Sequence, residues 1–137
     1  MKKTLFFVLA LVASVLALTS CEKKDKVENP LVGTWKYSFD AGWSMIHYTY
    51  VFDETNYSFT DQNDVDTQIK KGTYELNQTE CNGVLHQKTK TMNDGHTNQT
   101  VPDEEDIRFK YVINGNSLTI TIGLDWERPM EITLTKE

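Results

Sequence analysis

The chain has 137 residues, a formal net charge of −6 and two cysteines. This length suits one domain of ordinary size. The acidic balance disfavours nucleic acid and anionic lipid headgroups, so we expect no nucleic-acid partner.

The first 21 residues carry the clearest targeting pattern. Lys2-Lys3 gives a basic start, residues 5–18 are apolar and uncharged, and small residues precede Cys21. This order is typical of a secretory signal, and Leu18-Thr19-Ser20-Cys21 resembles the bacterial lipobox, in which the cysteine is lipidated and becomes the N-terminus. The apolar run is shorter than the roughly 20 residues of a membrane-spanning helix. We therefore expect a lipoprotein signal peptide at residues 1–20; the alternative is an ordinary secretory signal with Cys21 as a bystander.

The segment after the signal is polar up to Pro30. We expect residues 21–30 to form a lipidated tether that holds the protein in the cell envelope, on the outer membrane, through acyl chains on Cys21; more than one chain makes such anchoring stable. Whether the protein faces the periplasm or the cell surface stays open. With Cys21 lipidated, we expect Cys81 to form no intrachain disulfide.

The remaining residues, 31–137, alternate apolar and polar side chains in segment after segment. Leu31, Trp35 and Phe39 share one parity, for example, with polar residues between them. A period of two, rich in aromatic and β-branched residues, indicates half-buried antiparallel strands. We expect strands near residues 31–39, 44–53, 55–61, 67–76, 80–91, 106–114, 116–123 and 129–135.

Turn signals separate these strands. Asn114-Gly115 predicts a tight hairpin with both turn residues at positive φ, and Asn82-Gly83 and Asn93-Asp94-Gly95 are further turn candidates. Residues 80–91 alternate poorly and predict a weakly specified strand, and residues 93–106 are expected to be a long loop. Short connections between sequential strands predict an all-β, antiparallel, up-and-down eight-stranded barrel, whose closure removes exposed strand edges.

Three motifs carry a resemblance to a known family: Gly33-Thr34-Trp35 in the first strand, Gly72-Thr73-Tyr74, and the hairpin from Tyr111 to Leu118. With the lipobox, they make the chain similar to small lipocalin-like lipoproteins of Bacteroidota. The resemblance implies a calycin-type barrel whose tryptophan closes the base, with Arg128, Lys136 or no basic residue over its ring. The chain lacks the helix and disulfide common in eukaryotic lipocalins.

The barrel interior is expected to be rich in aromatic rings. Large rings with a few hydroxyls suit a ligand pocket, but an eight-stranded barrel is only just wide enough for its own side chains. We favour a mostly filled interior and leave the pocket open. Any ligand is expected among Trp35, Tyr37, Tyr48, Tyr50, Tyr74, Phe109 and Tyr111.

The sequence shows no motif of catalytic or metal chemistry. His47, His86 and His96 lack metal-ligand spacing, and no nucleophile motif occurs. His47 falls on the strand face opposite Tyr48 and is expected to point to solvent. The acidic runs at 61–66 and 103–106 lack the glycine usual in calcium loops. We therefore expect no enzyme, no catalytic residues, no metal and no cofactor.

These features predict a lipid-anchored cell-envelope binding protein that holds a small apolar or amphipathic ligand in its barrel. The alternative is a filled barrel that docks through its end loops on an envelope protein, a glycan or a protease. Trp43 and Trp126 lie in turn-like contexts and would then mark the contact surface; their other interpretation is capping of the barrel ends. The oligomeric state stays open.

Overall fold

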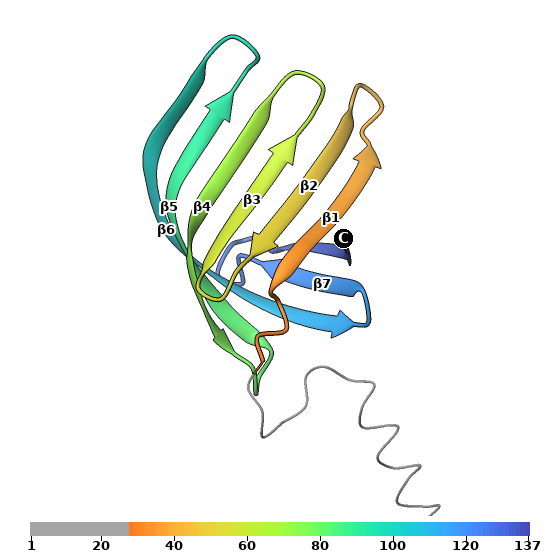
Figure 1. The fold of residues 1–137 in the computed structure, drawn as a ribbon, viewed down its shortest axis with the longest axis vertical. Coiled ribbons are helices and arrows are strands. Elements are labelled where there is room, and N and C mark those ends of the chain that lie inside the picture. Colours follow the sequence, from red (N-terminus) through yellow and green to blue (C-terminus); the bar gives the residue numbers. More distant parts are fainter. Residues whose placement is uncertain (1–27) are drawn as a thin grey trace, which may run out of the picture.

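The structure is a computed structural model that describes residues 28–137. Each strand in this part of the chain pairs antiparallel with the next, and the last pairs with the first (Figure 1). The strands are β1 (Gly33–Asp40), β2 (Met45–Phe52), β3 (Asn56–Gln62), β4 (Thr67–Asn77), β5 (Asn82–Asn93), β6 (Asn98–Asn114), β7 (Ser117–Ile122) and β8 (Met130–Lys136). The predicted fold class, an up-and-down closed barrel of eight strands, is confirmed and is consistent with a lipocalin-like fold.

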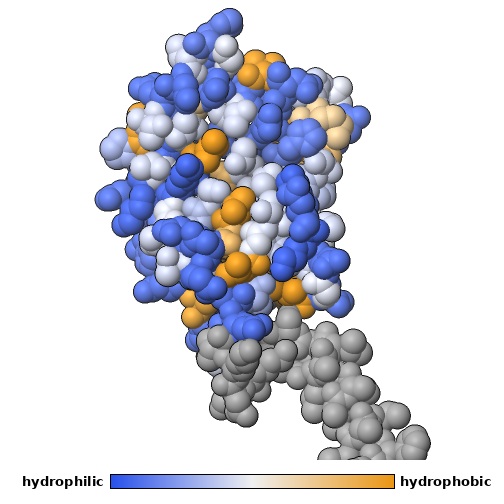
Figure 2. All heavy atoms as spheres, in the orientation of Figure 1, coloured by the Kyte–Doolittle hydropathy of each residue, from blue (hydrophilic) through white to orange (hydrophobic). Residues whose placement is uncertain are grey.

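The outer surface is mainly hydrophilic, as the alternation of the strands requires. Figure 2 shows hydrophilic side chains over most of the visible face, with apolar ones in small patches between them. Large apolar side chains that reach solvent include Trp43, Val65 and Val112. His47 is exposed, as predicted, and its Nδ1 lies 2.7 Å from the Ser38 hydroxyl oxygen.

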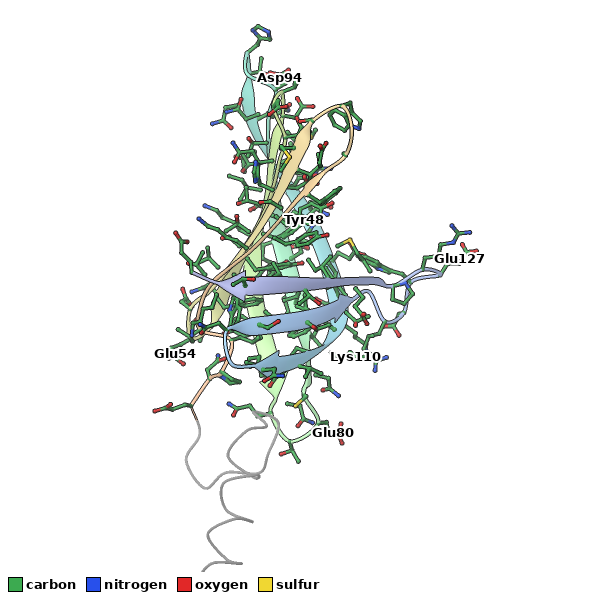
Figure 3. All side chains as sticks on the ribbon, turned by 90° about the vertical axis from the view of Figure 1, so that its right-hand side faces the viewer. Tyr48, Glu54, Glu80, Asp94, Lys110 and Glu127 are labelled. Atoms are coloured by element: carbon green, nitrogen blue, oxygen red, sulfur yellow. The ribbon has the colours of Figure 1, made fainter. Side chains whose placement is uncertain are left out.

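The barrel is closed only at the lower end of the view in Figure 1. β1 and β8 are paired at Trp35–Lys136 and Lys36–Thr135, and β6 pairs with β7 from Phe109 onwards. Above this level β1 to β6 continue as a curved open sheet, while β7 and β8 run across its lower part (Figures 1 and 3). The same inward face of β1 to β6 is therefore enclosed below and open above.

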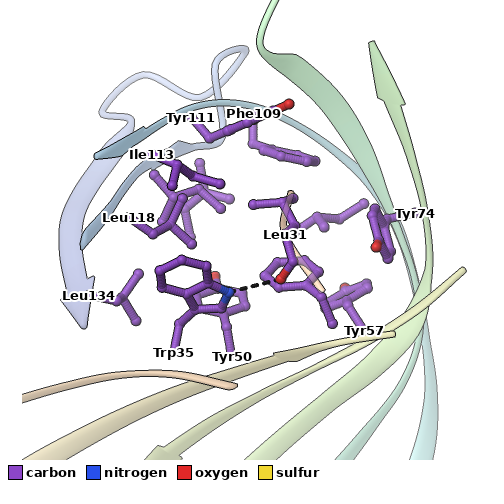
Figure 4. Packing of buried hydrophobic residues seen from close by; sticks show 14 of the residues in the cluster. Leu31, Trp35, Tyr50, Tyr57, Tyr74, Phe109, Tyr111, Ile113, Leu118 and Leu134 are labelled. Atoms are coloured by element: carbon purple, nitrogen blue, oxygen red, sulfur yellow. Dashed lines mark hydrogen bonds between the residues drawn. The ribbon is translucent and has the colours of Figure 1, made fainter. Parts of the chain in front are cut away.

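The closed end holds the hydrophobic core. Leu31, Trp35, Phe109, Leu118 and Leu134 are each at most 1% exposed, and Figure 4 shows side chains from opposite walls meeting between the strands. Burial of such side chains stabilises a fold by about 1.5–3 kcal/mol each. The described core is packed with side chains, in line with the filled interior that the sequence favoured.

Trp35 closes the barrel base, and its surroundings explain the Gly-X-Trp pattern. The indole Nε1 donates a hydrogen bond of 2.8 Å to the Leu31 carbonyl oxygen (Figure 4). The Lys136 ammonium lies 5.3 Å from the centre of the Trp35 ring, a cation–π distance, so Lys136 and not Arg128 covers the tryptophan. Gly33 has φ = 138°, and a Cβ there would lie 2.8 Å from Cε of Lys136. Glycine thus leaves room for the lysine stem.

The chain before β1 packs onto the barrel. Asn29 belongs to the segment that the sequence assigned to the tether, and its Nδ2 donates a hydrogen bond of 2.6 Å to the Tyr74 hydroxyl. Leu31 is fully buried. The predicted signal peptide and the predicted lipidation site, Cys21, lie outside the described residues. Within residues 28–137 no helix is long and apolar enough to span a membrane.

Cys81 corrects one expectation. It is buried and disulfide-bonded, whereas the sequence predicted no intrachain disulfide for it. The chain has one other cysteine, Cys21, which lies outside the described part. A sulfur atom in a disulfide cannot also carry a thioether-linked lipid, so lipidation of Cys21 and a disulfide between the two cysteines exclude each other.

The predicted strands match the observed ones closely except at β6. The loop expected at residues 93–106 is wrong, because β6 begins at Asn98 and pairs with β5 as far as Asn93. Pro102 and the acidic run after it hid this strand, because both are poor strand signals. They are tolerated there because the upper part of β6 has no partner on its other side, and edge strands accept proline and charge.

Two turns also differ from prediction. The β6–β7 hairpin loop is Gly115-Asn116, with Asn114 still paired. Gly115 has φ = 61°, but Asn116 is not at positive φ; a positive φ at the first central residue alone is the type II′ pattern. Asn82 and Gly83 belong to β5, and the turn before them ends at Cys81, with φ = 53°.

Candidate binding site

The structure divides the seven predicted ligand residues into two groups. Tyr37 is 38% exposed and Tyr48 is partly exposed, and both lie above the closed end. Figure 3 shows Tyr48 just above the level at which β7 and β8 cross the barrel. The other five are buried in the core at 0–6% exposure: Trp35, Tyr50, Tyr74, Phe109 and Tyr111.

The buried residues serve the packing of the closed end. The Tyr74 hydroxyl donates to the Asp53 carbonyl oxygen and accepts from Asn29, which joins the chain before β1 to the β2–β3 turn. The Phe109 ring lies over Gly83, where a Cβ would come within 2.8 Å of it. Side chains held in this way would have to move before a ligand could enter.

The open part of the inward face begins with a continuous set of aromatic rings. We call Tyr37, Phe39, Tyr48 and Phe59 the aromatic row. Tyr37 stacks on Phe39 at a centroid distance of 5.6 Å, and Tyr48 lies 5.7 Å from Phe39 and 5.5 Å from Phe59. Phe59 continues into the core through Tyr50, at 4.5 Å. These are the usual spacings of favourable aromatic pairs.

Burial and nearby charge affect the hydroxyl of Tyr48. Its pKa is raised above the ordinary value, first by burial and then by the negative charge of Asp61. Burial in turn raises the pKa of the Asp61 carboxyl, and the positive charge of Lys70 opposes this rise. The tyrosine is therefore a neutral hydrogen-bonding group at every physiological pH.

The other half of the open face is polar. Residues directly opposite in an antiparallel pair project to the same face. Phe59 pairs with Lys70, and Lys70 pairs with Lys90, so both lysines share the inward face with the aromatic row. Tyr48 pairs with Asp61, which pairs with Gln68. The open face thus carries the aromatic row on β1 to β3, with Asp61 beside it, and the polar side chains of Gln68, Lys70 and Lys90 on β4 and β5.

A buried amide marks the boundary between the open and closed parts. Gln87 is 2% exposed, and its Nε2 donates to the Asp103 carbonyl oxygen at 3.1 Å and to the carboxylate at 2.8 Å. Because both partners are acceptors, the orientation of the amide is fixed. Its Oε1 is the one buried side-chain polar atom in residues 28–137 with no hydrogen-bond partner. A donor such as water or a ligand hydroxyl would satisfy it.

The hairpin tips at the upper end are held to one another. The Ser44 hydroxyl accepts a hydrogen bond of 3.0 Å from the Asp64 backbone N–H, which links the β1–β2 loop to the β3–β4 loop. A hollow of about 240 Å³ lies beside the β3–β4 and β5–β6 tips, and Asp61, Gln68 and Met92 of the inward face help to line it. The rim of the open face therefore carries a hollow of its own beside the hairpin tips.

A second polar cluster lies on the outer face. His86 Nδ1 is 2.7 Å from Asp106 Oδ1, and its Nε2 is 3.2 Å from Glu75 Oε2. Hydrogen bonds to these two carboxylates, with that to Asp106 the stronger influence, raise the pKa of the imidazole. The cluster joins β4, β5 and β6. No group of three or more histidine, cysteine or acidic side chains in residues 28–137 is arranged to hold a metal.

Sequence reasoning found part of this site. Tyr37 and Tyr48 were predicted as ligand residues, whereas Phe39, Phe59, Lys70 and Lys90 were not. The parity of Gly72, Tyr74 and Leu76 already placed Lys70 on the inward face. For Lys90 that signal was broken by the bulge between Gln87 and Thr89.

No family model, curated protein or solved structure matches the chain.

Proposed function

We propose that this chain is a non-enzymatic binding protein of the cell envelope that takes a small amphipathic molecule. The observation that carries the proposal is the aromatic row, which lies partly exposed on a concave sheet face above a filled core. Binding sites for small molecules are concave and mostly apolar, with a few convergent polar groups. The proposed site is therefore the open face and not the enclosed end of the barrel.

The chemistry of the open face fits such a guest. An apolar body laid on the aromatic row would remove ligand and ring surface from water, worth about 25 cal/mol per Å² of apolar area before ordering costs. Ring stacking adds about 0.5–1.5 kcal/mol per pair. The polar side chains of β4 to β6 are placed to receive the polar end of the guest. No step of bond making is needed for this role.

Calorimetric titration of the full chain in nanodiscs with 2-naphthamide tests the proposal, with empty nanodiscs as the reference. This neutral bicyclic ring should bind saturably, and a Tyr37→Ala/Tyr48→Ala variant should bind about tenfold more weakly, which corresponds to about 1.4 kcal/mol. Trp43→Ala is the matched control because Trp43 is 70% exposed in the β1–β2 loop. No saturable binding, or equal losses in both variants, contradicts the proposal.

The lipid anchor is part of the same proposal. The lipobox-like Leu18-Thr19-Ser20-Cys21 and the apolar run before it support export and acylation of Cys21. Acylation requires that Cys21 is not the disulfide partner of Cys81. Together with the Gly-X-Trp base, they support a place among small bacterial lipocalin-like lipoproteins. In such a protein the chain from the anchor would reach the closed end of the barrel, where Asn29 and Leu31 pack, and the open face would lie at the opposite end (Figure 1).

A second candidate function is docking on another macromolecule. Trp43 is 70% exposed and Trp126 is 40% exposed, and large exposed aromatics often mark contact surfaces. Trp126 also packs on Gly123, where a Cβ would lie 2.0 Å from its ring. This packing supports a structural role for Trp126 and leaves Trp43 as the stronger docking residue.

A further inference from the structure

The open face carries two lysines that lie next to each other. Lys70 on β4 and Lys90 on β5 are directly opposite each other, and both are partly buried. Directly opposed side chains on one sheet face have Cβ atoms about 4.5–5.5 Å apart, and like charges there are destabilising. Taken by itself, the contact between the two lysines is unfavourable, and the negative charge of Asp61 on the same face offsets part of it.

Nothing in the described part of the chain neutralises this pair by direct contact. The ion pairs of residues 28–137 join Lys36 with Glu137, Arg108 with Asp125, and His86 with two carboxylates. Asp61 acts on Lys70 through space but forms no ion pair with it among these contacts. Two further carboxylates, Asp103 and Glu105, lie on the same inward face. Asp103 is hydrogen-bonded by Gln87, and neither forms an ion pair with a lysine among these contacts. Two cations thus stand together in a protein of net charge −6.

The pair is also placed next to the aromatic row. Lys70 is the direct cross-strand partner of Phe59, and Phe59 contacts Tyr48 and Tyr50. A molecule lying on the row would therefore have its far end beside the lysines. An anionic group at that point would relieve the repulsion and accept charge-assisted hydrogen bonds, which are about twice as strong as neutral ones.

We propose that the open face binds an amphipathic organic anion, with its apolar body on the aromatic row and its carboxylate or sulfonate between Lys70 and Lys90. This rests on the proposed function and specifies the ligand class of the same site. The acidic hollow at the hairpin tips stays outside this contact, because Asp61, Asp66 and Asp94 line it and would repel an anion. The anion binds one row nearer the core.

A matched ligand pair tests the inference. 2-Naphthoate and 2-naphthamide share the same ring body and differ in charge, and each is titrated against the full chain in nanodiscs. We expect 2-naphthoate to bind about tenfold more tightly, since hydrogen bonds to charged groups contribute about 1.5–3 kcal/mol. This advantage should shrink as salt is added, because ions screen exposed charges.

Substitution of the lysines separates the two proposals. In Lys70→Gln/Lys90→Gln the advantage of 2-naphthoate should disappear while 2-naphthamide binds as before. Lys110→Gln, on the exposed outer face, should keep the advantage. The double variant should melt at the same or a higher temperature than the parent, because it loses a repulsion.

Each other outcome counts against one proposal or both. The lysine site is overturned if 2-naphthoate binds no more tightly than 2-naphthamide, if its advantage survives the double variant, or if the advantage falls equally in Lys110→Gln. The proposed function still stands in these cases if 2-naphthamide binding depends on Tyr37 and Tyr48. Absence of binding by either ligand overturns both.

Discussion

Replacing Trp35 tests the barrel base through the energies that the structure assigns to it. The indole is 1% exposed, so Trp35→Ala removes a fully buried ring, and such truncations cost about 3–5 kcal/mol. Trp35→Phe keeps most of the apolar volume but removes the Nε1 donor from the buried Leu31 carbonyl. An orphaned buried acceptor costs about 1–3 kcal/mol.

A third variant isolates the charge over the ring. Lys136→Met keeps the stem that crosses Gly33 and removes the ammonium at 5.3 Å, and we expect a loss of about 0.5–1 kcal/mol. The expected order of destabilisation is therefore Trp35→Ala, then Trp35→Phe, then Lys136→Met.

Urea unfolding followed by far-ultraviolet circular dichroism measures the three variants without relying on indole fluorescence. A shift in midpoint at an unchanged slope gives each change in the free energy of unfolding. If Trp35→Ala costs less than about 1 kcal/mol, the ring does not belong to the core. If Trp35→Phe is as stable as the parent, the hydrogen bond to Leu31 contributes nothing and the base is held by packing alone.

Three further predictions concern other parts of the chain. Cys21→Ser should move the protein from the membrane to the soluble fraction and end labelling by a palmitate analogue. A variant that stays in the membrane fraction and is still labelled would contradict the anchor. In the parent protein, a Cys81 thiol that reacts with maleimide in denaturant only after reduction would favour the disulfide. Gly72→Ala should cost about 3 kcal/mol, because the new Cβ would lie 1.9 Å from the His86 carbonyl oxygen, whereas Thr73→Ala, on the exposed neighbour, should change stability by less than about 0.5 kcal/mol. His86→Gln should destabilise the protein most below the ordinary imidazole pKa of about 6.5. The pKa of His86 is raised in the fold, so the protonated imidazole stabilises the folded state, and this contribution is lost as pH rises through the raised pKa. A destabilisation that does not change with pH would mean that the carboxylates do not hold a charged imidazole.

Local patterns in the sequence predict most of the barrel because each strand is specified by its own residues. The alternation of Ile107, Phe109, Tyr111 and Ile113 appears as four buried side chains, and Gly115 lies in the expected hairpin. The upper part of β6 could not be predicted in this way. The inward side chains of this segment do not face an enclosed core, and one edge of the segment has no strand partner. No apolar alternation was therefore needed there.

The pairing of Lys136 with Trp35 shows a different limit of sequence reasoning. The two residues lie at opposite ends of the domain and meet because β1 and β8 close the barrel at this level. The sequence left Arg128, Lys136 or neither open, since the exact register of closure decides which stem reaches the ring. Once the register is known, it explains the glycine at position 33, which leaves space for the Lys136 side chain.

The division between the core and the open face depends on strand length and not on residue type. Trp35 and Tyr37 are successive inward residues of β1, yet one is 1% and the other 38% exposed. β7 and β8 are short, with six and seven residues, and they oppose only the lower rows of the inward face, whereas β4 and β5 extend to eleven and twelve. Lengthening β7 and β8 would cover the aromatic row and turn it into core, so the same alternation that fills the closed end provides an open aromatic surface where the opposing wall stops.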